Sequence, residues 1–230
     1  MDPCLSVVIP VFNEKATIEK SLAAVLAQAA VREVIIVDDC STDGTVEVLE
    51  RIVQLDKRIR LLRHLTNQGK GAAVRTGFQN VTSRYTLIQD ADLEYDPREY
   101  DKLLQPLLDG DADVVLGSRF IGGSSHRVLY FWHSVGNKFL TLLSNMATNL
   151  NLTDMECCYK VFKTELLQRF QIEEKRFGIE PEIVAKISRL GVRIYEVAVA
   201  YRGRTYEEGK KITWKDGVQA LLCIIKYRLR

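Results

Sequence analysis

The sequence predicts an α/β fold in which a mostly parallel central sheet is flanked by helices. Two observations support this fold class. Short apolar, β-branched runs alternate with segments of helical periodicity over residues 5–116, and strands that alternate with helices form parallel sheets. The chain also has no run of about 18 or more apolar residues, so no transmembrane helix is expected.

Each element is predicted from its local periodicity. Strands are expected where apolar residues run together or alternate, at residues 5–10, 33–37, 59–64, 85–89, 113–116 and 194–200. Helices are expected where apolar residues recur every three or four positions, at residues 15–28, 45–54, 70–79, 98–108, 180–190 and 216–230. The helix at 45–54 follows Ser41, Thr42 and Asp43, which are residue types that cap helix N-termini.

The chain changes character after residue 119. Residues 128–152 contain no acid, and their only basic residues are His133 and Lys138. This stretch is too polar to span a bilayer, yet it is unusually apolar for a surface helix. Residues 202–213 form a charged, glycine-containing loop that leads into the last helix.

Composition and charge narrow the classes of partner. The fractions of hydrophobic and charged residues, 47% and 27%, are ordinary for a globular protein and exclude a disordered chain. The formal net charge of +2 does not favour nucleic-acid binding. Residues 202–230, however, hold eight Lys or Arg and three Asp or Glu. This basic C-terminus indicates a locally anionic partner.

Carboxylates collect where the strands are expected to end. Glu14 follows the first strand, Asp38 and Asp39 end the second, and Asp90, Asp92 and Glu94 follow the fourth. Ligands of open parallel sheets bind outside these ends. Asp90 and Asp92 are two positions apart, so their side chains should leave the strand on the same side. Hard oxygen ligands in this number suit Mg²⁺ or Mn²⁺, completed by diphosphate oxygens.

Other candidate motifs are less specific. Asp39 can accept a hydrogen bond from a nucleobase or a ribose hydroxyl, and a helix cap is the alternative. The run Gln68-Gly69-Lys70-Gly71 matches neither phosphate-binding glycine pattern, so we interpret it as a glycine-rich helix start near the ligand. No serine, cysteine or histidine stands in an arrangement typical of a catalytic nucleophile.

Taken together, the motifs resemble those of one enzyme family. FNE, VDDCSTDGT, NQGKGAAVRTGF, QDADLEYDP and GSRF resemble the family 2 glycosyltransferases with the GT-A fold. Within that family the chain is most similar to the dolichyl- or polyprenyl-phosphate sugar synthases, the dolichol-phosphate mannosyltransferase group. The resemblance implies one catalytic domain over residues 1–230. Residues 1–120 would bind the nucleotide sugar, and residues 121–230 would bind the acceptor and end in the basic helix.

The resemblance also implies roles for individual residues. Nucleotide-sugar binding is implied for Pro10, Phe12, Glu14, Val37, Asp39, Asp90, Ala91, Asp92, Arg119, Arg204 and Lys210. Metal binding is implied for Asp90, Asp92 and Glu94, and acceptor binding for Arg127 and Ser134. Catalytic roles are implied for Asp92, Arg119, Asp154, Arg204 and Lys210. Relatives often read TDxxSGFR where this chain has residues 153–160, TDMECCYK, so the acceptor is the least specified substrate.

Residues and resemblance together predict a metal-dependent, inverting displacement. A hexose would move from a nucleotide-diphospho-sugar, of the GDP-mannose or UDP-glucose type, to a polyprenyl phosphate. That acceptor oxygen is already anionic at pH 7 and needs no strong base. Two alternatives stay open. Transfer to a saccharide or small-molecule hydroxyl would need Asp154 or Glu156 as base, and a non-catalytic nucleotide-sugar sensor would need no acceptor.

A lipid acceptor implies contact with a membrane surface. Residues 128–152 and the basic last helix are the candidate segments, and packing of both into the core is the alternative. We therefore expect a cytoplasmic protein that is peripheral on the cytoplasmic face of the membrane. Assistance by a membrane partner protein is left open.

Overall fold

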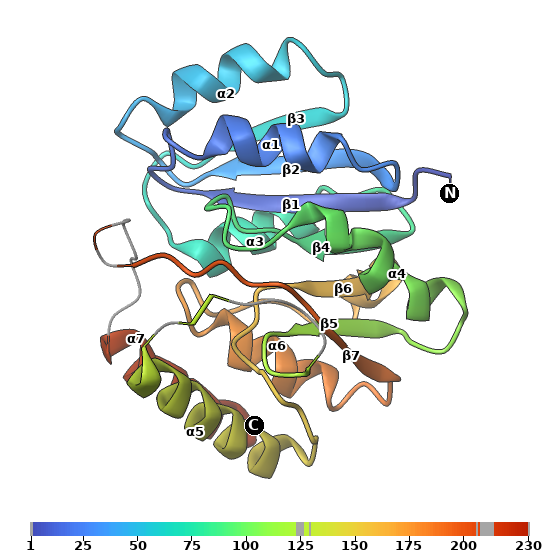
Figure 1. Cartoon of the computed structure of the whole chain (residues 1–230), viewed down its shortest axis with the longest axis vertical. Helices are drawn as coiled ribbons and strands as arrows, with labels where there is room; N and C mark the ends of the chain where they lie inside the picture. The colour runs from blue at the N-terminus through green and yellow to red at the C-terminus, as the bar shows by residue number, and fades with distance from the viewer. Residues whose placement is uncertain (1, 123–126, 129, 206, 208–213, 230) are drawn as a thin grey trace.

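The protein forms a seven-stranded sheet with helices packed on both faces (Figure 1). The computed structural model describes residues 2–122, 127, 128, 130–205, 207 and 214–229. The strands are β1 (Leu5–Val11), β2 (Val31–Asp38), β3 (Ile59–Arg63), β4 (Tyr85–Ile88), β5 (Val114–Ser118), β6 (Lys160–Lys163) and β7 (Ile194–Ala198). The helices are α1 (Ile18–Leu26), α2 (Thr45–Val53), α3 (Lys70–Phe78), α4 (Tyr100–Leu108), α5 (Phe131–Thr148), α6 (Ile179–Ile187) and α7 (Trp214–Arg228). The predicted α/β class is confirmed.

The strand order is β3-β2-β1-β4-β6-β5-β7, and β6 is the strand that the sequence analysis missed. It inserts between β4 and β5 and runs antiparallel to both, pairing Val161 with Leu87 and with Val115. The other strand pairs are parallel. The carboxyl ends of β1, β2, β4 and β5 therefore lie at one edge of the sheet, as the alternation of strands and helices predicted.

Two features hid β6 in the sequence. The strand has only four residues, and it begins and ends with lysines, Lys160 and Lys163. A buried lysine is rare unless it is paired. The ammonium of Lys160 is buried and is paired with the carboxylate of Glu180 on α6. This long-range contact stabilises a strand that local hydrophobicity does not indicate.

The two faces of the sheet are covered by different helices, because alternate side chains of a strand point to opposite faces. Val8 of β1 packs with Ile35 and Val37 of β2 and with Ala73 of α3. The neighbouring β1 residues Val7 and Ile9 belong to the main core, which includes the apolar stripe of α1. Figure 1 shows α1 and α3 on opposite sides of β1.

Two glycines at the start of α3 allow another segment to pack against it. A Cβ on Gly71 would lie 2.0 Å from the carbonyl oxygen of Glu174, and one on Gly69 would lie 2.3 Å from that of Lys175. The amide of Ala72 donates a hydrogen bond to the same Lys175 oxygen. The glycine-rich run is therefore a close-packing site between α3 and the segment before α6.

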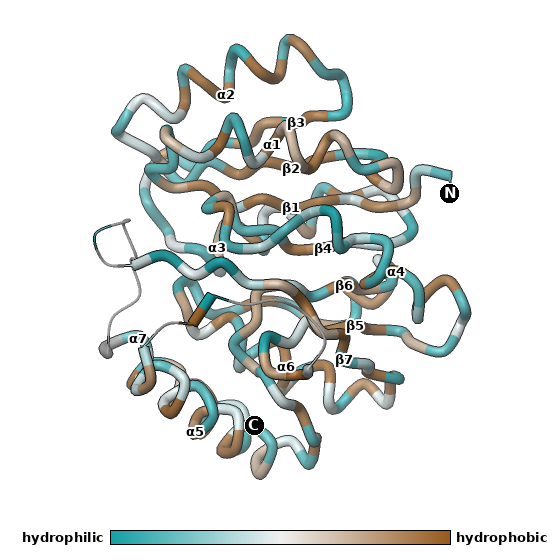
Figure 2. Tube along the Cα trace, in the orientation of Figure 1, coloured by the Kyte–Doolittle hydropathy of each residue, from teal (hydrophilic) through white to brown (hydrophobic). Residues whose placement is uncertain are grey.

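Helices α5 and α7 pack against each other at one end of the molecule, away from the sheet (Figure 1). Figure 2 shows many apolar residues along both helices, although they lie at its periphery. Among the described residues, no helix combines the length and apolar character needed to cross a bilayer.

The glycine contacts predict opposite effects of the same substitution at two helical positions. Gly71→Ala should destabilise the fold by about 2 kcal/mol, because the new methyl group would overlap a backbone oxygen. Gly136→Ala on α5 should stabilise it by about 0.5 kcal/mol, since no described residue beyond the helix's own backbone comes within 4 Å of the added Cβ and alanine favours the helix. Denaturant unfolding of both variants measures this difference, and equal destabilisation would contradict the packing account.

Candidate active site

A cleft of about 550 Å³ opens at the carboxyl ends of the strands. It is lined from the first half of the chain by Pro10, Val11, Phe12, Glu14, Asp39, Asn67, Gly69, Lys70, Ala73, Asp90, Ala91, Asp92, Glu94, Tyr95 and Arg119. The second half contributes Glu156, Cys158, Arg176, Phe177, Glu180, Tyr201, Arg204, Asp216 and Gln219. Many of the residues predicted to bind a nucleotide sugar are thus brought to one cavity.

Hydrogen bonds from a buried side chain hold the acidic turn after β4 in place. Buried Gln89 donates a hydrogen bond to the carbonyl oxygen of Asp90, and its own side-chain oxygen accepts from the hydroxyls of Tyr100 and Tyr159. Leu93 then adopts a positive φ of 65°, which few non-glycine residues do. These contacts fix the backbone that presents Asp90, Asp92 and Glu94 to the cleft.

Two basic side chains from distant segments compensate the acidic turn. The ammonium of Lys70, on α3, lies 2.9 Å from Asp90 and 3.2 Å from Glu180. The guanidinium of Arg204 lies 2.8 Å from Asp92, 3.3 Å from Glu94 and 3.6 Å from Glu14. The charge pattern of this edge therefore depends on both halves of the chain.

The two aspartates of the turn differ in their electrostatic environment. Burial opposes ionisation of Asp90, but the ammonium of Lys70 holds the pKa of Asp90 below its ordinary value. Burial, together with the carboxylates of Asp90 and Glu94, raises the pKa of Asp92 to about 7 against the opposing effect of Arg204. The protein neighbours of Asp92 therefore compensate the charge of its ionised form incompletely, and a bound cation would favour that form.

The predicted three-carboxylate metal site is not formed by protein ligands alone. Glu94 accepts hydrogen bonds from the Tyr201 hydroxyl at 2.7 Å and from the Arg204 amide at 3.0 Å. Among the described residues, no group of three acidic, histidine or cysteine side chains is arranged to hold a metal ion. The carboxylates of Asp90 and Asp92 still fit Mg²⁺ or Mn²⁺, because such ions commonly take one or two carboxylates and complete their coordination with substrate phosphates.

Asp39 lies in the cleft wall but already has protein partners. Its carboxylate accepts hydrogen bonds from the amides of Gln68 and Gly69, at 2.9 and 2.6 Å, and lies 2.7 Å from Nδ1 of His64. It therefore fixes the loop before α3 and has little remaining capacity for a ligand. Val37 packs in the core beneath α3 and does not line the cleft.

Arg119 and Asp154 form a buried, two-pronged ion pair. The Nε and Nη2 atoms of Arg119 donate to the two carboxylate oxygens of Asp154 at 2.6 and 2.7 Å, and the Asn137 amide adds a third donor. Arg119 lowers the pKa of Asp154 despite burial. Asp154 does not line the cleft. It holds Arg119, which does, and so acts as a positioning residue.

Two further predicted site residues, Arg127 and Ser134, lie away from the cleft wall. Arg127 donates to the carbonyl oxygen of Gly203, next to Arg204. Ser134 is partly buried on α5. Neither is among the residues that line the cleft. Lys210 lies outside the described residues.

Several cleft residues were missed because their positions depend on tertiary packing. Arg176 and Phe177 are brought there by the segment that packs on Gly69 and Gly71. Tyr201 reaches the acidic turn through its hydrogen bond to Glu94. Two sequence features could have indicated these residues: the glycine pair at the start of α3, and the position of Tyr201 three residues before Arg204. Neither feature shows which segment the residues would contact.

Comparison with known proteins identifies the family and agrees with the fold. The model of the family "Glycosyl transferase family 2" matches residues 6–170, and the chain belongs to this family. It is thus a glycosyltransferase. An undecaprenyl-phosphate mannosyltransferase of Micrococcus luteus is 28% identical over 215 residues, covering 88% of this chain and 85% of the relative. An uncharacterised protein of Methanocaldococcus jannaschii is 27% identical over 233 residues, covering 96% of this chain and 97% of its own.

Solved structures support the predicted GT-A fold. Glucosyl-3-phosphoglycerate synthase from Mycobacterium tuberculosis, in complex with Mn²⁺, UDP and glucosyl-3-phosphoglycerate, superposes with a TM-score of 0.75 at 21% identity. The match covers 98% of this chain and 80% of that one. The same enzyme in complex with Mn²⁺ and UDP-glucose matches equally well, with a TM-score of 0.75.

The buried ion pair predicts a large stability effect. Asp154→Ala should destabilise the protein by about 3 kcal/mol or more, because it leaves the Arg119 guanidinium buried without its carboxylate. Glu19→Ala breaks an exposed pair with Arg51 and should cost under about 1 kcal/mol. Urea unfolding measures both values. If the two variants lost equal stability, Asp154 would not hold Arg119 as described.

Proposed function

We propose that this protein transfers a hexose from a nucleotide-diphospho-sugar to a polyprenyl phosphate at a membrane surface, with inversion at the anomeric carbon. The donor is of the GDP-mannose or UDP-glucose type. One observation carries the proposal. The second half of the chain exposes an extended apolar surface on α5 and α7, and α7 also contributes Asp216 and Gln219 to the cleft.

The donor would lie along the carboxyl edge of the sheet. Pro10 and Phe12 would contact the nucleoside, and the diphosphate would lie near the acidic turn. A divalent cation held by Asp90 and Asp92 would neutralise charge on the leaving diphosphate. Arg119 and Arg204 would contact phosphate oxygens, and Lys210 is assigned the same role by the family resemblance. An anionic acceptor oxygen then needs no strong base, in keeping with the engagement of Asp154 by Arg119.

The acceptor assignment rests on the apolar surface and on the Micrococcus luteus relative, which acts on undecaprenyl phosphate by its name. On α5, six large apolar side chains are exposed along one stripe: Phe131, Trp132, Val135, Phe139, Leu142 and Met146. Three more on α7 and one just after its end continue a helical spacing: Val218, Leu222, Ile225 and Leu229. Contiguous exposed apolar surface of this kind marks an interaction site.

The charge of this surface favours an anionic bilayer. Helix α5 contains no acidic residue and carries exposed Lys138. Arg228, exposed in the last turn of α7, adds a second positive charge. Each basic residue near an anionic surface contributes about 1 kcal/mol, so attachment would be reversible and sensitive to salt. We infer a peripheral protein on the cytoplasmic face, where charged nucleotide sugars are available to a membrane-bound acceptor.

The metal role predicts a loss of activity without loss of fold. Asp92→Asn should lower transfer at least about 100-fold and remove the Mg²⁺ dependence of donor binding, because one hard oxygen ligand is lost. Asp101→Asn, an exposed position on α4, is the matched control and should behave like the wild type. Calorimetric donor binding with Mg²⁺ and with EDTA measures the effect. A fully active Asp92→Asn enzyme would show that Asp92 does not bind the metal ion.

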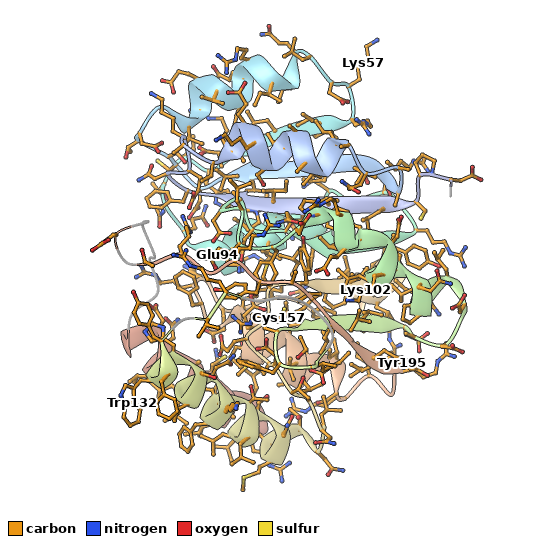
Figure 3. All side chains as sticks on the ribbon, viewed as in Figure 1. Lys57, Glu94, Lys102, Trp132, Cys157 and Tyr195 are labelled. Carbon is orange, nitrogen blue, oxygen red and sulfur yellow. The ribbon has the colours of Figure 1, made fainter. Side chains whose placement is uncertain are left out.

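The apolar surface predicts membrane binding that depends on two side chains. Trp132 is 77% exposed and projects outward at the edge of the molecule (Figure 3), and Phe139 is 54% exposed. A Trp132→Ser/Phe139→Ser double variant should sediment with anionic vesicles at least about tenfold less than the wild type. A Leu55→Ser/Leu65→Ser variant removes apolar residues that are at least as exposed elsewhere on the protein, and it should bind normally. Equal binding by all three proteins would exclude α5 as the membrane contact.

Transfer itself is tested with radiolabelled sugars. GDP-mannose and UDP-glucose are each incubated with the protein, Mg²⁺ and undecaprenyl phosphate, and the mixture is extracted with organic solvent. The proposal predicts that label from one donor moves to the organic phase in proportion to the acceptor supplied. Label transferred only to water-soluble saccharide acceptors would favour the hydroxyl alternative instead.

A further inference from the structure

Among the described residues, Glu156 is a cleft carboxylate with a buried oxygen that has no hydrogen-bond partner. Asp90, Asp92 and Glu180 are each paired with a basic side chain. Within the part of the chain that the structure describes, the Oε1 atom of Glu156 is buried and has no hydrogen-bond partner. The residue nevertheless lines the cleft. A buried polar atom without a hydrogen-bond partner is energetically unfavourable. A bound ligand that hydrogen-bonds to this oxygen would remove that cost.

The backbone on either side of Glu156 is fixed. The amide of Met155 donates to the Thr141 hydroxyl at 3.2 Å, and that of Cys158 donates to the Tyr95 hydroxyl at 3.3 Å. The Lys160 ammonium donates to the carbonyl oxygens of Met155 and Cys157. The Glu156 side chain is therefore presented to the cleft from a rigid segment, as a specificity residue requires.

A chain of ion pairs links the surroundings of Glu156 to the acidic turn, and both line the same cleft. Lys160 bonds to Glu180, and Glu180 contacts Lys70, which in turn contacts Asp90. Burial and the neighbouring carboxylate of Glu180 raise the pKa of Glu156 to about 7, whereas Lys160 and Arg119 oppose the rise and Asp154 adds to it. At neutral pH this carboxyl group can accept a hydrogen bond from a hydroxyl or donate one to it.

The substrates differ in what they can offer to such a group. The diphosphate of the donor and the phosphate of the acceptor are anionic, and a carboxylate repels them. The hexose is neutral and rich in hydroxyl groups, and it is attached to the diphosphate that the adjacent acidic turn would hold. We propose that Glu156 binds a hydroxyl group of the donor hexose and thereby helps to select the transferred sugar. This inference rests on the proposed function for its donor, but it does not depend on the acceptor.

The test measures binding of the full chain to two probes in the presence of Mg²⁺. One is the nucleotide sugar, GDP-mannose or UDP-glucose, that binds the wild type better, and the other is its nucleoside diphosphate. Glu156→Ala should weaken nucleotide-sugar binding at least tenfold and change diphosphate binding less than twofold. Glu156→Gln, which keeps hydrogen-bonding atoms, should lose less. Glu50→Gln, on the exposed side of α2, is the control and should match the wild type.

A second readout separates sugar recognition from a structural role. Monodeoxy analogues of the hexose should identify one hydroxyl whose removal weakens wild-type binding about tenfold, and the same removal should leave Glu156→Ala binding unchanged. The melting temperatures of the variants should stay near that of the wild type, since Oε1 has no protein partner to lose.

Each of the following results would overturn the proposal. If Glu156→Ala bound the nucleotide sugar as tightly as the wild type, Glu156 would not contact the sugar. If the variant lost the same affinity for both probes, the substitution would have a general effect on the cleft. Unchanged binding with a lower kcat toward hydroxyl acceptors would make Glu156 a base for the acceptor. If the wild type bound no nucleotide sugar, the proposed function would fail and this inference with it. Failure of polyprenyl phosphate as acceptor would leave the binding result intact.

Discussion

The organisation of the cleft depends on compensating the carboxylates that meet at one edge of the sheet. Asp90, Asp92 and Glu94 share a short turn, and like charges so close together would repel one another if left unpaired. The structure meets this constraint with Lys70 from α3 and Arg204 from the segment after β7. Because Lys70 also contacts Glu180 of α6, the compensation joins residues that are 110 positions apart in the chain. Because the charge of ionised Asp92 is compensated incompletely, this edge could hold a divalent cation, which in turn would attract a diphosphate.

The second half of the chain both lines the cleft and forms the exposed apolar surface. Helix α7 packs Cys223 and Tyr227 inward with Ala185 of α6, and it exposes Leu222 and Ile225 outward. Asp216 and Gln219, in the first turns of α7, line the cleft. A ligand that reaches the cleft past α7 would therefore pass close to exposed apolar side chains. This arrangement suits an acceptor whose phosphate reacts in the cleft while its hydrocarbon chain stays in a bilayer.

The sequence predicted the fold and the gathering of first-half residues at one edge of the sheet, because both follow from local periodicity and from the rule that parallel strands end at a common edge. Pro10, Asp39, Asp90 and Asp92 reach the cleft for that reason. It failed where a long-range pair decides the outcome. Lys160 lies in a strand through its contact with Glu180, and Asp154 pairs with Arg119 and does not line the cleft. Nor could the helical spacing of α5 and α7 distinguish an exposed stripe from a buried one, since both obey the same period.

The central claim, that transfer takes place at a bilayer through the α5–α7 surface, is tested most directly by comparing two forms of one acceptor. The initial transfer rate is measured with undecaprenyl phosphate in anionic vesicles and with a short-chain, water-soluble prenyl phosphate, for the wild type and for the Trp132→Ser/Phe139→Ser variant. The account predicts that the variant loses transfer to the vesicle-embedded acceptor and keeps normal transfer to the short one. Equal rates for both proteins in vesicles, or an equal loss on both acceptors, would contradict it.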